Sequence, residues 1–137
     1  MTTSEQTHAV EAAGRPILVA DDDPEMVSII VEALSHKGYR VATARHGKEA
    51  LARVEEERPQ LILLDMTMPV MDGWTFARAL HERYGRSIPI VVITAVEDSK
   101  LRADELGAEG ELGKPFSLQH LYDVVADILP NGGDGAP

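Results

Sequence analysis

The sequence of 137 residues contains no cysteine and no long apolar run. Without cysteine there can be no disulfide framework, no thiolate nucleophile and no cysteine-based metal site. No apolar run approaches the roughly 20 residues that span a membrane, and the polar residues 1–11 do not resemble a signal peptide. These absences predict a soluble, cytoplasmic protein.

Positive charge is also scarce. Thirteen lysine and arginine residues stand against 23 aspartate and glutamate residues, which gives a formal net charge of −10. Such a charge repels phosphate backbones and anionic lipids, so we expect neither nucleic acid nor membrane as a direct partner. Hydrophobic residues make up 44% of the chain, enough for one core. We expect one folded domain over residues 16–130, between a flexible extension (1–15) and a flexible tail (131–137).

Apolar segments alternate with amphipathic ones along that domain. The segments predicted as strands are 16–20, 39–44, 61–65, 88–94 and 109–113, and those predicted as helices are 24–37, 47–58, 72–84, 98–106 and 117–129. Strands that are apolar throughout are typical of a parallel sheet with helices on both faces. The sequence therefore predicts a doubly wound α/β fold.

The spacing of apolar residues predicts the helix faces. The first helix has a core row and an adjacent row, formed by Val27, Ile30, Val31 and Leu34 and by Met26, Ile29 and Ala33. Either both rows are buried, or Met26 and Ile29 are exposed and contact a partner helix. The fourth helix has a thin inward face and the last a fuller one, formed by Leu101, Ala103 and Leu106 and by Leu118, Leu121, Val124, Val125 and Ile128. We expect the fourth helix to be weakly held.

Side-chain caps are expected at Asp23, Asp72 and Ser117, where helices begin. The five histidines are scattered without metal-ligand spacing and are interpreted as surface residues. They are His8, His36, His46, His81 and His120.

The strand over 61–65 is the most informative segment because it is apolar until it ends in a carboxylate, Asp65. In open α/β sheets, ligands bind beyond the carboxyl ends of the strands. The ends of the other strands carry Asp21, Asp22, Thr94 and Lys114, and the topology brings all of them to one edge. Two carboxylates about 4 Å apart repel by about 4 kcal/mol at an effective dielectric of 20, so the cluster needs cations.

Carboxylate oxygens without histidine or cysteine select Mg²⁺ or a similar ion. Lys114 adds a positive charge and Thr94 a hydroxyl donor. Together these residues could accept a phosphoryl group on Asp65. Taken singly, Lys114 could equally pair with any surface acid, and Thr94 could simply satisfy the end of a strand.

At this point the chain resembles the receiver domain of two-component response regulators. Asp21-Asp22 resembles its acidic pair, Asp65 its phospho-acceptor, and the segments 68–69 and 71–73 the loop that follows. Thr94-Ala95 and Lys114-Pro115-Phe116 resemble its switch hydroxyl and its lysine motif. The resemblance covers about residues 16–129 and implies a flavodoxin-like fold with strand order 2-1-3-4-5.

The resemblance also implies roles for the site residues. Mg²⁺ would be bound by Asp22, Asp65 and the backbone carbonyl of Thr67, with Asp21 acting through a water. A histidine kinase or phosphotransfer protein would donate the phosphoryl group, and the first helix, with Met26 and Ile29, would face it. Asp65 would become a 4-aspartylphosphate, and Thr94 would move toward the new group. The chain would then be a signalling switch that catalyses only its own phosphorylation and dephosphorylation. The Lys114-Pro115 bond is expected to be cis.

One residue departs from the family pattern. Glu111 stands three residues before Lys114, where the family usually has an aromatic switch residue. An acid cannot enter an apolar pocket without a desolvation cost of several kcal/mol unless it is paired or protonated. We therefore expect the output surface to work differently here, through charge.

Two alternatives come from other functional classes. A degenerate, unphosphorylated scaffold is disfavoured because Asp22, Asp65, Thr94 and Lys114 are all present. A hydrolase of the dehalogenase type needs a second acid two residues after the nucleophile, where Thr67 stands. The sequence after Leu129 is too short for an output domain. We therefore expect a stand-alone receiver of the chemotaxis type that contacts an unknown downstream protein or relays the phosphoryl group.

Overall fold

Strands and helices alternate throughout the computed structural model, which describes residues 14–130. In chain order they are β1 (Ile17–Ala20), α2 (Pro24–His36), β2 (Val41–Ala44), α3 (Gly47–Glu56), β3 (Leu61–Asp65), α4 (Gly73–Tyr84), β4 (Ile90–Ala95), α5 (Ser99–Leu106), β5 (Gly110–Lys114) and α6 (Leu118–Ile128). All ten elements were predicted, and no predicted boundary differs from the observed one by more than two residues. The expected tail and most of the expected N-terminal extension lie outside the described residues.

The five strands form one parallel sheet in the order β2-β1-β3-β4-β5. The parallel, doubly wound sheet was predicted from the residues, and its strand order is the one that the resemblance to receiver domains implied. The register places Ala20 of β1 beside Leu64 of β3, and Asp65 of β3 beside Ile93 of β4. The acidic residues that follow β1 therefore emerge next to the end of β3.

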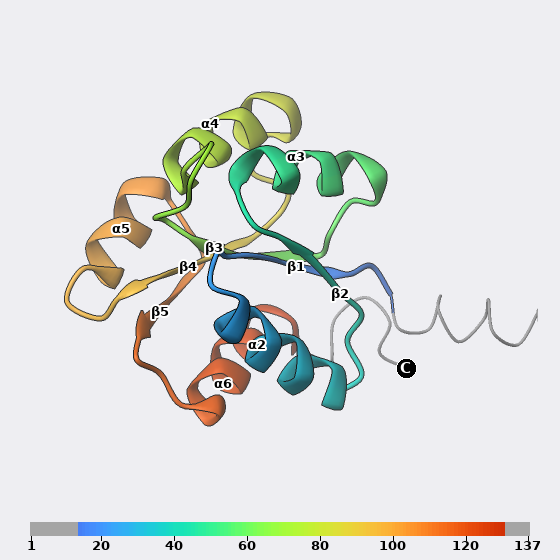
Figure 1. The fold of residues 1–137 in the computed structure, drawn as a ribbon, viewed down its shortest axis with the longest axis vertical. Coiled ribbons are helices and arrows are strands. Elements are labelled where there is room, and N and C mark those ends of the chain that lie inside the picture. The colour runs from blue at the N-terminus through green and yellow to red at the C-terminus, as the bar shows by residue number, and fades with distance from the viewer. Residues whose placement is uncertain (1–13, 131–137) are drawn as a thin grey trace, which may run out of the picture.

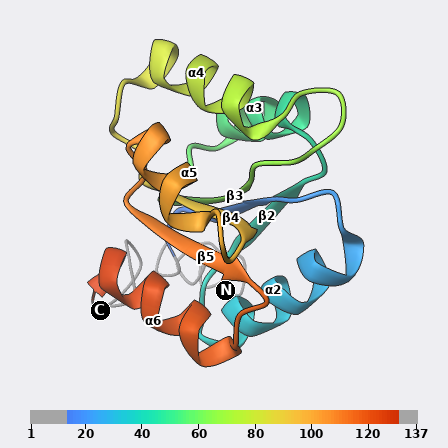
Figure 2. The same cartoon turned by 90° about the vertical axis from the view of Figure 1, so that its left-hand side faces the viewer.

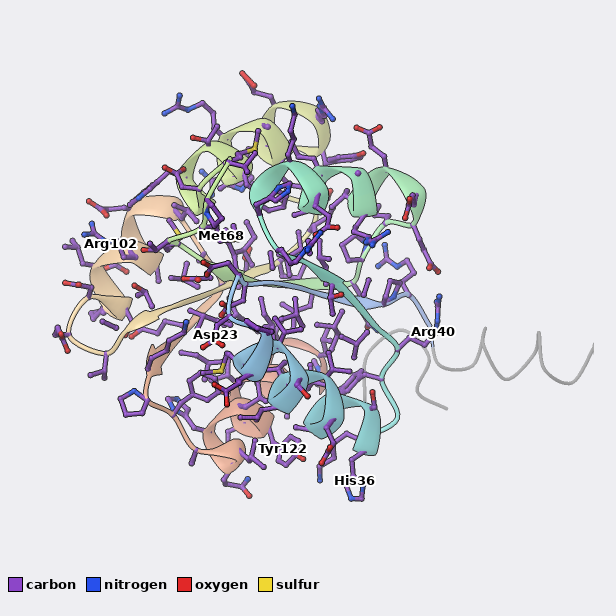
Figure 3. All side chains as sticks on the ribbon, in the orientation of Figure 1. Asp23, His36, Arg40, Met68, Arg102 and Tyr122 are labelled. Carbon is purple, nitrogen blue, oxygen red and sulfur yellow. The ribbon has the colours of Figure 1, made fainter. Side chains whose placement is uncertain are left out.

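Helices cover both faces of the sheet. Figures 1 and 2 show α3, α4 and α5 on one face and α2 and α6 on the other. Side chains fill both layers (Figure 3) and form two separate cores. Along β3, Ile62 and Leu64 belong to the core under α4, whereas Leu61 and Leu63 belong to the core under α2 and α6. Each fully buried large side chain contributes about 1.5–3 kcal/mol to stability.

The helix starts have the expected side-chain caps. Asp23 accepts hydrogen bonds from the N–H groups of Glu25 and Met26, and Asp72 accepts one from Thr75. Ser117 caps α6 by accepting from the N–H of His120. A fourth cap was not predicted. Nδ1 of His46 accepts a hydrogen bond from the N–H of Glu49 at 3.1 Å and caps α3.

Several expected side-chain positions need correction. His46 is half-buried at its cap and His81 is half-buried on α4, whereas His36 and His120 are exposed; His8 lies outside the described residues. Leu101 was expected to face inward, but its side chain is 52% exposed and Ser99 is buried instead. Leu118 also points outward from the first position of α6. These errors arise at helix ends, where spacing alone does not fix which side faces the sheet.

The outer row of α2 divides between core and surface. Ile29 is 52% exposed, whereas Met26 is half-buried and packs against the core beneath α2. Ala33 is buried, and the expected core residues Val27 and Val31 are only half-buried. Of the three residues in this row, only Ile29 is exposed to solvent.

The loop between β3 and α4 contains a turn with unfavourable backbone geometry. Val70 has φ 65°, and the N–H of Met71 donates to the carbonyl of Pro69 at 2.6 Å, the hydrogen bond of a γ-turn. A β-branched residue rarely adopts positive φ. The Val70 side chain is 75% exposed, so packing does not compensate for this conformation.

Replacing Val70 with glycine should raise the free energy of unfolding by about 1 kcal/mol. Glycine adopts positive φ freely, and the relief exceeds the added entropy of the unfolded chain. Chemical denaturation measures the change, and Val70→Ala should lie between wild type and Val70→Gly. A Val70→Gly variant less stable than wild type would contradict the strained turn.

Candidate functional site

Three carboxylates meet where β1 and β3 end. Asp21 and Asp22 follow β1 directly and Asp65 is the last residue of β3, so the parallel register places them together. One oxygen from each carboxylate lies within 4.8 Å of the other two. Asp21 and Asp65 are buried and Asp22 is exposed. Among the residues described, the chain thus concentrates three negative charges in a space the size of a metal site.

Lys114 supplies the neighbouring positive charge from the end of β5. Its Nζ lies 3.2 Å from Oδ2 of Asp21 and 4.0 Å from Oδ2 of Asp65. Oδ2 of Asp21 is fully buried and has no partner with hydrogen-bond geometry among the described residues, even though the ammonium group is close. A buried carboxylate oxygen left in this way is costly, and a bound cation would satisfy it.

Backbone N–H groups fix the remaining oxygens. Oδ1 of Asp21 accepts from the N–H of Asp23 at 2.9 Å, and Oδ1 of Asp65 accepts from the N–H of Thr67 at 3.1 Å. Both bonds span two residues, so each carboxylate is held by the turn that follows its own strand. The other oxygen of each carboxylate is left facing Lys114.

Burial is the largest effect on the Asp65 carboxyl. Together with repulsion from the Asp21 carboxylate, burial raises the pKa of Asp65 from an ordinary 3.8 to about 7. The hydrogen bond from Thr67 and the charge of Lys114 act in the opposite direction but do not cancel the rise. A cation bound among the carboxylates would favour the ionised form of Asp65.

The loop after Asp65 approaches the site closely. A Cβ atom on Gly73 would lie 2.9 Å from the carbonyl oxygen of Asp65 and 2.9 Å from Cα of Met66, so only glycine fits there. The N–H of Gly73 donates to the carbonyl of Met66 at 3.2 Å, and Asp72 caps the helix that follows. Asp72 is thus a helix cap, and among residues 14–130 no hydrogen bond or ion pair joins it to the acidic cluster.

Thr94 and Glu111 lie on the two strands at the β5 edge of the sheet. Thr94 of β4 lies opposite Gly113, and Glu111 of β5 lies opposite Val92. A Cβ on Gly113 would be 2.5 Å from Cα of Val96, so glycine lets the segment after β4 pack onto β5. The N–H of Val96 also donates to the carbonyl of Lys114 at 3.0 Å. The Lys114-Pro115 peptide bond is cis, as expected.

The sequence profile of the response regulator receiver domain matches residues 17–126. The chain belongs to the receiver domain family. Its relatives include the alkaline phosphatase synthesis transcriptional regulatory protein PhoP of Bacillus subtilis, 36% identical over 125 residues, which are 90% of this chain and 52% of PhoP. The transcriptional regulatory protein PrrA of Mycobacterium tuberculosis is 37% identical over 88% of this chain and 52% of its own length. The chain therefore spans about half the length of these curated relatives.

Solved receiver structures have the same fold. The chemotaxis protein CheY4 of Vibrio cholerae superposes with a TM-score of 0.75 and 32% identity, covering 84% of this chain and 98% of that one. The receiver domain of a Pseudomonas aeruginosa sensor histidine kinase has a TM-score of 0.75 and 31% identity, covering 83% and 96% of the two chains, and holds a magnesium ion in its active site cleft. The acidic cluster of the present receiver is consistent with Mg²⁺ binding.

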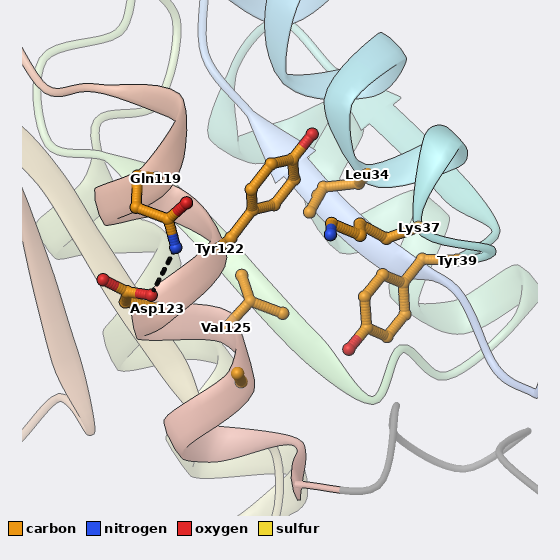
Figure 4. Close-up of a pocket in the computed structure, with 8 residues that line it drawn as sticks. Leu34, Lys37, Tyr39, Gln119, Tyr122, Asp123 and Val125 are labelled. Atoms are coloured by element: carbon orange, nitrogen blue, oxygen red, sulfur yellow. Dashed lines mark hydrogen bonds between the residues drawn. The ribbon is translucent and has the colours of Figure 1, made fainter.

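A crevice of about 430 Å³ opens beside the acidic cluster of the receiver, between the start of α2 and the end of β2. Its lining includes Asp21, Asp22 and Arg45. A second hollow, about 330 Å³, lies between α2 and α6, where the Lys37 ammonium group is 4.6 Å from the centre of the Tyr122 ring (Figure 4). Its lining contains none of the predicted site residues, so it is separate from the acidic cluster.

None of the described helices has the length and apolar composition to cross a bilayer.

Asp65→Asn should stabilise the metal-free receiver increasingly as the pH rises. Because the folded pKa of Asp65 is raised, its contribution to stability is fully present below about pH 4 and is lost as the pH rises through about 7. The asparagine variant cannot ionise, so its advantage in unfolding free energy should reach about 2 kcal/mol at pH 8. Urea denaturation from pH 4 to pH 8 with a chelator measures this difference. Asp104→Asn, which neutralises an exposed acid on α5, is the control and should change the free energy of unfolding by less than about 0.5 kcal/mol.

Proposed function

We propose that this receiver accepts a phosphoryl group on Asp65 in a Mg²⁺-dependent reaction and thereby switches a protein-binding surface. The observation that carries the proposal is the buried Asp65 carboxylate, placed among two further carboxylates with Oδ2 facing Lys114. The chain would catalyse only its own phosphorylation and dephosphorylation, because the acceptor is part of the protein.

The donor set suits Mg²⁺. Asp22 and Asp65 would bind the ion together with the backbone carbonyl of Thr67, and Asp21 would act through a water. The exposed Asp22 leaves the site open to solvent, which fits an ion that keeps several waters. When bound, Mg²⁺ would neutralise charge on the phosphoryl oxygens and favour ionised Asp65.

Asp65 acts as the nucleophile. One of its carboxylate oxygens forms the new P–O bond as the P–N bond of a donor phosphohistidine breaks, and that electron pair returns to the imidazole nitrogen. Lys114 then pairs with an oxygen of the transferred group, for which its present contacts with Asp21 and Asp65 place it well. The Thr94 hydroxyl donates to a second phosphoryl oxygen, which draws the end of β4 toward Asp65.

The donor would be a histidine kinase or a phosphotransfer protein. Exposed apolar side chains lie on segments at the site edge: Ile29 on α2, Val70 after β3, Val96 after β4 and Leu118 after β5. A partner that seals the site against water needs apolar contacts around the acceptor. Ile29 serves this purpose better than Met26, which is already engaged in the core.

The output is proposed as a contact between the switched surface and another protein segment. The curated relatives are transcriptional regulatory proteins about twice as long as their match to this chain. The expectations that this receiver acts as a stand-alone protein in the cytoplasm and binds no nucleic acid itself therefore stay predictions.

Incubation with a small phosphodonor such as acetyl phosphate and Mg²⁺ should add one phosphoryl group to the wild-type chain, as measured by intact mass. Omitting Mg²⁺ or replacing Asp65 with asparagine should abolish the gain, whereas Asp104→Asn should retain it. A wild-type chain that stays unmodified would favour the scaffold interpretation over the phosphorylated switch.

Ile29→Asp should slow phosphoryl transfer from a histidine kinase or phosphotransfer protein by about tenfold or more, because a charge replaces an apolar contact. Labelling by acetyl phosphate should be unchanged, since Ile29 is not part of the acidic cluster. Both rates are measured by intact mass over time. Equal slowing with both donors would rule out Ile29 as a partner contact.

A further inference from the structure

Helix α5 has little apolar contact with the rest of the domain. Its buried apolar side chains are Ala103 and Leu106, and Leu101 points to solvent. Arg102, labelled in Figure 3, is half-buried, with its guanidinium 5.7 Å from the centre of the Trp74 ring of α4. A helix with so little buried apolar area depends on polar contacts for its position.

The C-terminal end of α5 is fixed by Arg86. Its Nη1 donates to the carbonyl of Leu106 at 2.9 Å and to that of Gly107 at 3.4 Å. These are carbonyls at the helix end, which otherwise lack intrahelical donors. Gly107 ends the helix in the left-handed conformation, with φ 69°.

The N-terminal end of α5 is held by Ser99. Asp98 occupies the cap position but makes no side-chain hydrogen bond to the helix. The Ser99 hydroxyl, in a residue only 4% exposed, lies 3.2 Å from the carbonyl of Val96 and 3.3 Å from Oε1 of Glu111. The hydroxyl has one proton, which these two acceptors share. Among the described residues, the contact with Glu111 is the one side-chain hydrogen bond that joins α5 to β5.

Glu111 lies on the same strand face as Gly113, because the two residues are separated by one position. Gly113 is where the segment after β4 packs onto β5, at Val96. Val96 follows Thr94 by two residues and precedes Ser99 by three. A short segment thus connects Thr94 to the hydroxyl that binds Glu111.

We propose that Ser99 and Glu111 form a polar latch that holds α5 against β5 in the unphosphorylated receiver, in place of an aromatic switch residue. The proposal deepens the proposed function and rests on it for the event that opens the latch. Thr94 moves toward the phosphoryl group, Ser99 leaves Glu111, and the half-buried carboxylate turns to water because it has lost its donor. The α5–β5 surface then changes in charge as well as in shape.

The latch is tested first on the unphosphorylated chain, by hydrogen exchange of peptides covering residues 95–106. Ser99→Ala and Glu111→Met should each speed exchange at the start of α5 by about three- to tenfold, the effect of losing one partly buried hydrogen bond. The double variant should exchange no faster than Ser99→Ala, because that substitution already removes the contact with Glu111. Glu111→Gln keeps an acceptor oxygen and should stay within about twofold of wild type.

Glu97→Gln is the matched control, since this exposed acid lies in the same segment. Its exchange should equal that of wild type, and exchange in β3 should be unchanged in every variant. Unchanged exchange in both single variants, or additive effects in the double variant, would overturn the latch. Faster exchange spread over the whole domain would also overturn it, because the contact would then serve global stability.

The second test measures the rate of phosphorylation by acetyl phosphate with Mg²⁺. Removing a latch that holds the unphosphorylated arrangement should speed modification of Ser99→Ala and Glu111→Met by about two- to fivefold. An unchanged or slower rate would overturn the switching role. If wild type gains no phosphoryl group, the proposed function fails, while the exchange experiment still decides whether the latch exists.

Discussion

Three carboxylates beside a single ammonium group are the constraint on which the rest of this receiver depends. Lys114 cannot balance Asp21, Asp22 and Asp65, so the site of the folded chain is short of positive charge. Burial is the main cause of the raised pKa of Asp65, and repulsion from the Asp21 carboxylate raises this pKa further. A cluster with more carboxylates than cations is consistent with binding of a divalent cation, whose charge the carboxylates would stabilise.

The fold keeps the charges together even though they repel. Asp21 and Asp65 belong to neighbouring strands in fixed register, and both strands are buried in the middle of the sheet. Separating the carboxylates would break main-chain hydrogen bonds and expose both cores, at a cost far above the repulsion. The surrounding turns add N–H donors to Asp21 and Asp65, and Gly73 lets the next helix approach closely.

The assembly of the acidic edge could be predicted from the residues themselves, whereas the strand order was implied by the resemblance to receiver domains. Apolar strands that end in Asp21, Asp65 and Lys114 can meet only at one edge of a parallel sheet, so their proximity follows from topology. Distances, burial and the missing hydrogen-bond partner of Asp21 Oδ2 are visible only in the structure, because residue patterns in a sequence do not specify them.

Contacts between distant side chains could not be predicted in this way. Helix α5 has eight residues, too few for its period to fix the inward face, so Ser99 takes the place expected for Leu101. The Ser99–Glu111 contact joins residues twelve apart, and Arg86 reaches the end of α5 from twenty residues before it. His46 was missed as a cap because histidine is not among the usual capping residues. Such contacts depend on the final packing of α5, α4 and β5.

The unequal attachment of α5 determines how this helix can move. Arg86 and the left-handed turn at Gly107 anchor its last carbonyls, whereas one hydroxyl secures its first turn. A helix held at its C-terminal end moves by rotating about that end, so the displacement is largest at its N-terminal end. The free end here is the one nearest Thr94. A small displacement at the acceptor site would therefore rotate the whole helix, and the exposed face that carries Leu101 would turn with it.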